Sequence, residues 1–173
     1  MIHNLRISDN GIKKLKQLEG CVKIGDRHVV YDDKTGKIVN LNQPLPRGAT
    51  IGYGHLITSG ESFTNGISET TATELLCADI EVAENAVRNT ITMQLTQNQY
   101  DALVIFAYNI GTKNFVTSTV VRYLNNPNFH SPLYPNLESA WKAWNKSGGQ
   151  KNAGLVNRRD AEWNIFKNAK YFY

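Results

Sequence analysis

The sequence predicts a mostly helical α+β protein with a small antiparallel β-hairpin lobe and a larger helical lobe. Its 173 residues are 41% hydrophobic and 20% charged, values typical of one globular domain that can bury a core. Residues 22–58 alternate strand-like segments with turns, whereas most of the remainder has helical periodicity. We therefore expect one domain over 1–173, with a β-containing lobe at about 20–66, a connecting helix at 68–90 and a helical lobe at 91–173. A cleft between the lobes is the expected ligand site.

The first helix is expected to begin after Ser8, because serine commonly caps helix N-termini. Ile12, Leu15 and Leu18 follow at helical spacing and give the helix one apolar face. The helix should end at Glu19-Gly20, because glycine readily adopts the left-handed conformation that terminates helices.

Residues 22–39 have the composition of a small antiparallel hairpin, with turn residues at 25–26 and 33–36. The segment 40–48 contains two prolines and is too polar to pair inside a sheet, so we expect a loop there. A short strand or turn at 51–57 closes the lobe.

Helices dominate the rest of the chain. Ser68 precedes a long helix, and Thr96 with Gln99 forms the sequence pattern of a capping box that opens another. The expected helices cover residues 69–89, 96–111, 114–124, 137–144 and 156–166.

Net charge and cysteine spacing limit the partners, metal sites and disulfides that the sequence predicts. The net charge of +4 favours polyanions, but no nucleic-acid-binding motif or dense basic run accompanies it, so no nucleic acid partner is expected. Cys21 and Cys77 lack metal-binding spacing. Two reduced thiols that pack inside the protein are favoured over a disulfide, which remains the alternative.

We expect no signal peptide or membrane anchor in the N-terminal segment. Met1–Leu18 lacks the apolar core of a signal peptide or anchor, and no window of the chain approaches the ~20 apolar residues of a spanning helix. We therefore expect synthesis in the cytoplasm and no stable membrane insertion.

Glu19, Asp33 and Thr50 follow one another in an order that suits glycoside hydrolysis. Cleavage of a glycosidic bond needs one carboxyl that protonates the leaving oxygen and a second carboxylate for the opposite face of the sugar. Glu19 has few charged neighbours in sequence and suits the proton donor, although a solvated glutamate at a helix end remains the alternative.

The second carboxylate is Asp33 or its neighbour Asp32. Aspartate is common in turns, so a purely structural role remains open for both. Strand alternation would place Asp33 on the same face as Tyr31 and Asp32 on the opposite face, which favours Asp33.

Thr50 opens the run Thr-Ile-Gly-Tyr-Gly-His. Its hydroxyl can both donate and accept, so it can hold a water together with Asp33. Gly52 and Gly54 would let the backbone approach a sugar closely. His55 is expected to be a structural hydrogen-bonding residue and not a catalyst.

These motifs, in this order, resemble those of the phage-type lysozymes, which include the T4-like and lambdoid endolysins. The resemblance covers about residues 8–168 and extends to Phe106-Ala-Tyr-Asn109-Ile-Gly111 and to Gly154-Leu-Val-Asn-Arg158-Arg159-Asp-Ala-Glu162. The chain departs from the compact family pattern at Lys37–Ala49, where T4-like members have only a few residues.

The resemblance implies a lysozyme-like fold and a muramidase that cleaves the β-1,4 bond between N-acetylmuramic acid and N-acetylglucosamine with inversion. Inverting enzymes hold their carboxyl groups roughly 6.5–9.5 Å apart. Glu19, Asp33 and Thr50 would be catalytic, and Tyr31, Gly52, Tyr53 and Asn109 would bind substrate. A structural role at the helix end remains the alternative for Asn109.

The resemblance further implies a monomer that binds peptidoglycan glycan strands, needs no metal or cofactor, and reaches the wall by release or delivery. Structural pairing is expected for Arg158 or Arg159 with Glu162, and Trp141, Trp144 and Trp163 are expected in the core. A lytic transglycosylase and an inactive glycan-binding relative remain alternative functions.

Overall fold

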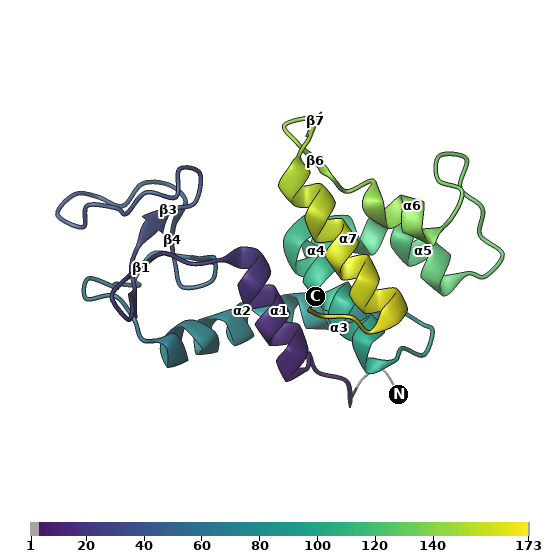
Figure 1. The fold of residues 1–173 in the computed structure, drawn as a ribbon, viewed down its shortest axis with the longest axis horizontal. Helices are drawn as coiled ribbons and strands as arrows, with labels where there is room; N and C mark the ends of the chain where they lie inside the picture. Colours follow the sequence, from purple (N-terminus) through teal and green to yellow (C-terminus); the bar gives the residue numbers. More distant parts are fainter. Residues whose placement is uncertain (1–3, 173) are drawn as a thin grey trace. The chain divides into compact units, whose positions relative to one another are not determined.

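The computed structural model describes residues 4–172 and has seven helices and seven short strands in that range (Figure 1). The chain divides into two compact units. The helical unit comprises Met1–Leu15 and Glu81–Tyr173, of which 1–3 and 173 lie outside the described residues, and the β-bearing unit comprises Lys16–Ile80. The boundaries fall inside α1 (Asp9–Glu19) and α2 (Glu69–Thr90), so both helices contribute residues to both units.

The helical unit is organised around α3 (Gln97–Ile110), in which every residue from Tyr100 to Ala107 is buried. The other helices of this unit are α4 (Thr112–Thr117), α5 (Thr119–Asn125), α6 (Leu137–Lys142) and α7 (Ala153–Asn168). α3 packs mainly along α7, which is yellow in Figure 1. Aromatic rings fill the space between helices, since Phe106 lies 4.6 Å from Trp141 and 6.3 Å from Phe115, measured between ring centroids.

The predicted helix ends are largely confirmed because local side chains form them. Ser8 caps α1, as the Gly11 amide donates to its hydroxyl at 3.1 Å. The Thr96 amide donates to Oε1 of Gln99 at 3.0 Å at the start of α3. The single helix expected near 114–124 is two helices, because Ser118 has an extended backbone and its hydroxyl caps α5.

The β-bearing unit contains two separate small sheets where the sequence predicted one hairpin. The strands of the first are β1 (Lys23–Ile24) and β2 (Arg27–His28), and those of the second, in spatial order, are β3 (Tyr31–Asp32), β4 (Ala49–Ile51) and β5 (His55–Leu56). Ile38 forms only an isolated bridge to Tyr31, and residues 40–48 form the expected loop. The antiparallel register places Thr50 opposite Tyr31, which brings two predicted site residues side by side.

Two expectations are wrong. Strands β6 (Lys146–Ser147) and β7 (Gln150–Lys151) form a hairpin that the sequence did not predict. Cys21 and Cys77, both within the described range, are not joined by a disulfide, as expected, but both are exposed and so do not pack in the core. Within residues 4–172, no helix has the length and apolar character needed to cross a bilayer.

Candidate active site

Glu19 is the last residue of α1, and its half-buried side chain belongs to the β-bearing unit. Gly20 follows with φ 68°, a conformation that glycine adopts without strain, and its amide donates to the Lys16 carbonyl at 3.0 Å. The helix therefore stops at the candidate proton donor, as the sequence predicted.

Asp32 and Asp33 have different surroundings. The Asp32 carboxylate accepts hydrogen bonds from the amide and the hydroxyl of Thr35, at 2.9 and 3.0 Å. The Thr35 amide, followed by its hydroxyl, lowers the pKa of Asp32. Asp32 thus stabilises the turn after β3, whereas the exposed Asp33 is the one that acts electrostatically on Tyr31.

Thr50 lies in the middle of the three-stranded sheet and is 3% exposed. Its hydroxyl donates to the Gly48 carbonyl at 2.9 Å. A hydroxyl that donates one hydrogen bond keeps its lone pairs, so Thr50 can still accept a hydrogen bond from a water molecule.

The Tyr31 phenol links the predicted site residues. Burial raises the pKa of this phenol first of all, and the nearby charges of Asp33 and Glu19 raise it further, while the Gly54 amide has the opposite effect. A Cβ atom placed on Gly54 would lie 3.8 Å from Oε2 of Glu19. The structure therefore gathers Glu19, Tyr31, Asp33 and Gly54 within the β-bearing unit, with Thr50 paired to Tyr31.

Two other predicted substrate-binding residues in this unit, Tyr53 and Gly52, contact α2. The Tyr53 phenol is 9% exposed and donates to Oε1 of Glu69 at 2.6 Å. Gly52 packs against α2, since a Cβ atom there would lie 3.3 Å from Cβ of Ala72. Their substrate-binding role stays a prediction.

His55 is held by two carboxylates. Nδ1 lies 2.9 Å from Asp79 and Nε2 lies 3.0 Å from Glu61. Burial lowers the pKa of His55, but the hydrogen bonds and charges of Asp79 and Glu61 outweigh it, so the pKa is raised overall. The predicted structural hydrogen bonding of His55 is confirmed.

In the helical unit, Asn109 is held by a buried ion cluster. Nη2 of Arg159 donates to Oδ1 of Asn109 at 2.6 Å and to Glu162 at 2.8 Å. Nε of Arg158 also donates to Glu162 at 3.3 Å, so both arginines make the predicted structural pairs. Burial raises the pKa of the fully buried Glu162 carboxyl even though both guanidinium groups oppose it.

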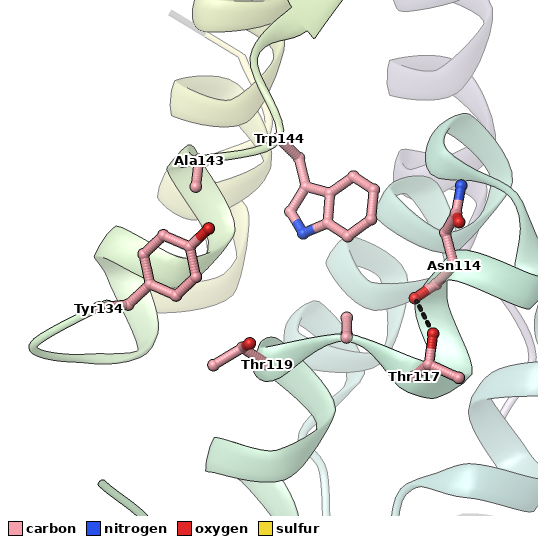
Figure 2. A pocket seen from close by; sticks show the side chains of 7 residues that line it. Asn114, Thr117, Thr119, Tyr134, Ala143 and Trp144 are labelled. Carbon is pink, nitrogen blue, oxygen red and sulfur yellow. Dashed lines mark hydrogen bonds between the residues drawn. The ribbon is translucent and has the colours of Figure 1, made fainter. Parts of the chain in front are cut away.

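Two adjoining hollows flank Trp144 in the helical unit. The first, of about 410 Å³, is lined by Tyr134 and the hydroxyl residues Thr117 and Thr119, with the indole above them (Figure 2). The second, of about 420 Å³, includes Asn109. Trp141 is buried as expected, but Trp144 and Trp163 are only half-buried, so the expectation of three core tryptophans is wrong in part.

The sequence prediction missed Glu69, whose carboxylate contacts several elements of the β-bearing unit. Acidic residues are common in the first turn of a helix, so Glu69 carried no signal beyond dipole stabilisation. Metal binding has no obvious location, because no group of three or more His, Cys, Asp or Glu side chains suited to a metal occurs among the described residues.

The fold and these residues define a two-unit α+β protein whose β-bearing unit carries two carboxylates and a threonine around a tyrosine. The family model for phage lysozyme matches residues 16–162, and the chain belongs to this family.

Several of its relatives are phage endolysins. The chain is 36% identical over 162 residues to the endolysin of Bacillus phage B103, covering 94% of this chain and 54% of that protein. It is 35% identical over 158 residues to the endolysin of Salmonella phage P22, covering 90% and 94%. Its structure is similar to an endolysin from Escherichia coli O157:H7 phage FAHEc1, with a TM-score of 0.76, 29% identity and 98% coverage of each chain. The chain spans about half the length of the Bacillus phage relatives.

Proposed function

We propose that this chain is a muramidase that hydrolyses the β-1,4 bond between N-acetylmuramic acid and N-acetylglucosamine in peptidoglycan, with inversion. The observation that carries the proposal is the gathering of Glu19 and Asp33 around Tyr31, with Thr50 paired opposite, in a member of the phage lysozyme family. We further propose that residues 1–173 act as one lysozyme-like domain, with the lobes at about 20–66 and 91–173 and the helix 68–90 between them in sequence.

Glu19 would donate its proton to the leaving glycosidic oxygen. Its half-buried side chain lies at the end of α1, in the same unit as Asp33 and Thr50. No metal or cofactor enters this step, because the proton and the attacking water supply all the chemistry.

Asp33 and Thr50 would each accept a hydrogen bond from the attacking water. The Thr50 hydroxyl already donates to Gly48, so it meets a water as an acceptor, and the Asp33 carboxylate is an acceptor as well. A water bound in this way directs an oxygen lone pair towards the sugar. As the bond to carbon forms, Asp33 takes one proton, and the anomeric centre inverts.

The alternatives use fewer of these residues. A lytic transglycosylase works with one acid/base carboxyl and leaves the Asp33–Thr50 pair without a task. An inactive relative would need only to bind glycan. The presence of all three groups in the β-bearing unit therefore favours hydrolysis.

The test is digestion of purified peptidoglycan by the wild type, Glu19→Gln and, as a matched control, Glu74→Gln on the exposed surface of α2. We expect the wild type and Glu74→Gln to clear the suspension and produce new reducing ends. Glu19→Gln should lose about 100-fold or more in rate, because the amide cannot donate the proton. Products with 1,6-anhydro ends would show that the enzyme is a lytic transglycosylase and not a hydrolase. A protein that sediments with the wall but does not clear the suspension would be a binding protein.

The setting of this activity follows from the substrate. We propose that the chain acts as a monomer on peptidoglycan strands of the cell wall, as a phage endolysin made in the host cytoplasm and released or delivered to the wall. Nucleic acid and stable membrane insertion have no part in this function. Size-exclusion chromatography with light scattering tests the monomer directly.

A further inference from the structure

The Glu69 carboxylate at the start of α2 accepts hydrogen bonds from four side chains. Oε1 accepts from the Tyr53 phenol at 2.6 Å and from the Lys16 ammonium at 2.9 Å. Oε2 accepts from the Lys23 ammonium and lies within hydrogen-bonding distance of Nε2 of His28, both at 2.9 Å. One carboxylate thus connects α1, the β1–β2 hairpin, the turn after β4 and α2.

These contacts exceed what helix stability requires. A glutamate in the first turn already interacts favourably with the helix dipole without any side-chain donor. Burial alone would raise the pKa of Glu69, but the hydrogen bonds from Tyr53, Lys23, His28 and Lys16 hold it far below its usual range. These donors therefore favour the charged carboxylate, which accepts their hydrogen bonds.

Tyr53 is the partner that leads to the active site. It lies between Gly52 and Gly54 in the turn that joins β4 to β5. Its ring is also fixed from two sides, since the Lys16 ammonium lies 5.0 Å from the ring centroid and the His28 ring lies 5.1 Å away, edge to face. A tyrosine held at its hydroxyl and at its ring leaves the adjoining backbone little freedom.

The backbone next to Tyr53 lies close to Glu19 and to Tyr31. The Gly54 amide lowers the pKa of the Tyr31 phenol, and a Cβ atom placed on Gly54 would lie 3.8 Å from Oε2 of Glu19. Gly54 has φ 90°, so its placement depends on the turn and not on a regular strand. A shift of this turn would move the amide away from Tyr31 and would change the space beside the Glu19 carboxylate.

We propose that Glu69 is a positioning residue that acts through Tyr53 to hold Gly54 against Tyr31 and Glu19. The inference rests on the proposed function, because Glu19 is taken as the proton donor. In this proposal the Tyr53 phenol donates its hydrogen bond to Glu69 and does not contact the substrate.

The test compares Tyr53→Phe, Glu69→Gln and the double variant with Glu138→Gln. Glu138 is a matched control, because it also pairs with a lysine near the start of a helix and has 45% side-chain exposure against 46% for Glu69. Circular dichroism at the assay temperature verifies that each variant is folded, and Tyr53→Phe removes only one hydroxyl. The kinetic constants are measured on soluble peptidoglycan fragments.

We expect Tyr53→Phe and Glu69→Gln to lower kcat by about 10- to 100-fold, as for a small displacement of reacting groups. KM should remain within about twofold, because the interaction is not with the substrate. The double variant should be no slower than Glu69→Gln, since both changes break one chain of contacts. Wild-type kcat in a folded Glu69→Gln would show that Glu69 only fastens the elements together, and a raised KM with unchanged kcat in Tyr53→Phe would make Tyr53 a substrate contact. Either result overturns the proposal.

A second measurement does not depend on lysis. The amide resonance of Gly54 and the carboxyl titration of Glu19 can be followed by NMR in the wild type, Tyr53→Phe and Glu138→Gln. We expect both signals to change in Tyr53→Phe and neither in Glu138→Gln. Unchanged signals in Tyr53→Phe would overturn the positioning role even if the wild type cleaves peptidoglycan. A wild type without lytic activity would refute the proposed function and leave this measurement to decide the positioning role.

Discussion

The helical unit and the β-bearing unit are stabilised in different ways. In the helical unit, a continuous run of buried residues from Tyr100 to Ala107 packs against other helices and excludes water. In the β-bearing unit no strand exceeds three residues within the described range, and charged side chains such as Glu69 and His55 connect the segments. The helical unit therefore combines a continuous buried helix with a buried charge cluster, whereas hydrogen bonds to partly exposed charged groups connect the short segments of the β-bearing unit.

The difference suits the proposed chemistry. Apolar contacts are non-directional, and many arrangements of similar volume satisfy them. Hydrogen bonds to charged groups are short and directional, so they fix the positions of the groups that they join. The candidate catalytic residues Glu19, Asp33 and Thr50 all lie in the unit that relies on such bonds.

The largest expected effect is on stability and lies in the helical unit. Glu162→Gln should lower the free energy of unfolding by about 3–5 kcal/mol, because it removes a buried carboxylate that pairs with two buried guanidinium groups. Glu138→Gln, which removes an exposed pair with Lys142, should cost at most about 1 kcal/mol. Chemical denaturation measures both. Equal losses would mean that burial of the charge cluster has no energetic consequence.

The next effect is on activity and lies in the β-bearing unit. Asp33→Asn should reduce the rate of peptidoglycan hydrolysis by about 100-fold or more, because the amide cannot accept the proton of the attacking water. Asp32→Asn is the control at the adjacent position and should act mainly on the turn that Asp32 forms with Thr35. Rate measurements on folded variants decide between them, and the reverse order of severity would identify Asp32 as the catalytic carboxylate.

The third prediction concerns the pH dependence of stability in the β-bearing unit. The pKa of His55 is raised in the folded state, so its contribution is complete below the unfolded value of about 6.5 and is lost as pH rises through the folded pKa. The pKa of Glu69 is lowered, so its contribution is present above about 4.5 and is lost only as pH falls towards the folded value. The two groups therefore respond to opposite ends of the pH scale.

Asp79→Asn separates the histidine contribution. Near pH 6 the variant should be less stable than the wild type by about 1.5–3 kcal/mol, the range for a hydrogen bond to a charged group. The difference should shrink as pH rises, because His55 loses its charge in both proteins. Denaturation curves at several pH values test this, and a constant difference across the range would exclude titration of His55 as the cause.

The smallest effect is expected from the loop at Lys37–Ala49. Removing residues 41–45, which are all exposed, should change the unfolding free energy by less than about 1 kcal/mol, because loop-closure entropy depends weakly on length. Substrate preference should change more than kcat. A folded deletion variant as inactive as Glu19→Gln would instead place this loop in the active site.

The sequence predicted the structure best where the determinants are local. Ser8, Thr96 and Gly20 mark helix ends through contacts within four residues, and these ends are where they were expected. The two sheets were merged into one hairpin because strands of two or three residues carry too little alternation to define a register. The β6–β7 hairpin was missed for the same reason.

The candidate site also contains residues that the sequence predicted and residues that it did not. Glu19 and Asp33 were found from motif order, and the preference for Asp33 over Asp32 has support from the turn that Asp32 forms. Glu69 could not be found, since its donors Lys16, Lys23 and His28 are distant in sequence and none has a distinctive spacing. The sequence also gives no sign that the Tyr53 phenol donates to Glu69, which lies 16 residues further along the chain.

The distribution of two residue types has a practical consequence for spectroscopy. All three tryptophans lie in the helical unit, and both cysteines lie exposed in the β-bearing unit. Intrinsic fluorescence therefore monitors one unit, while a dye attached to a thiol monitors the other, without any engineered change to the chain. Heating a labelled sample while recording tryptophan and dye fluorescence would reveal whether the two units unfold together or one after the other.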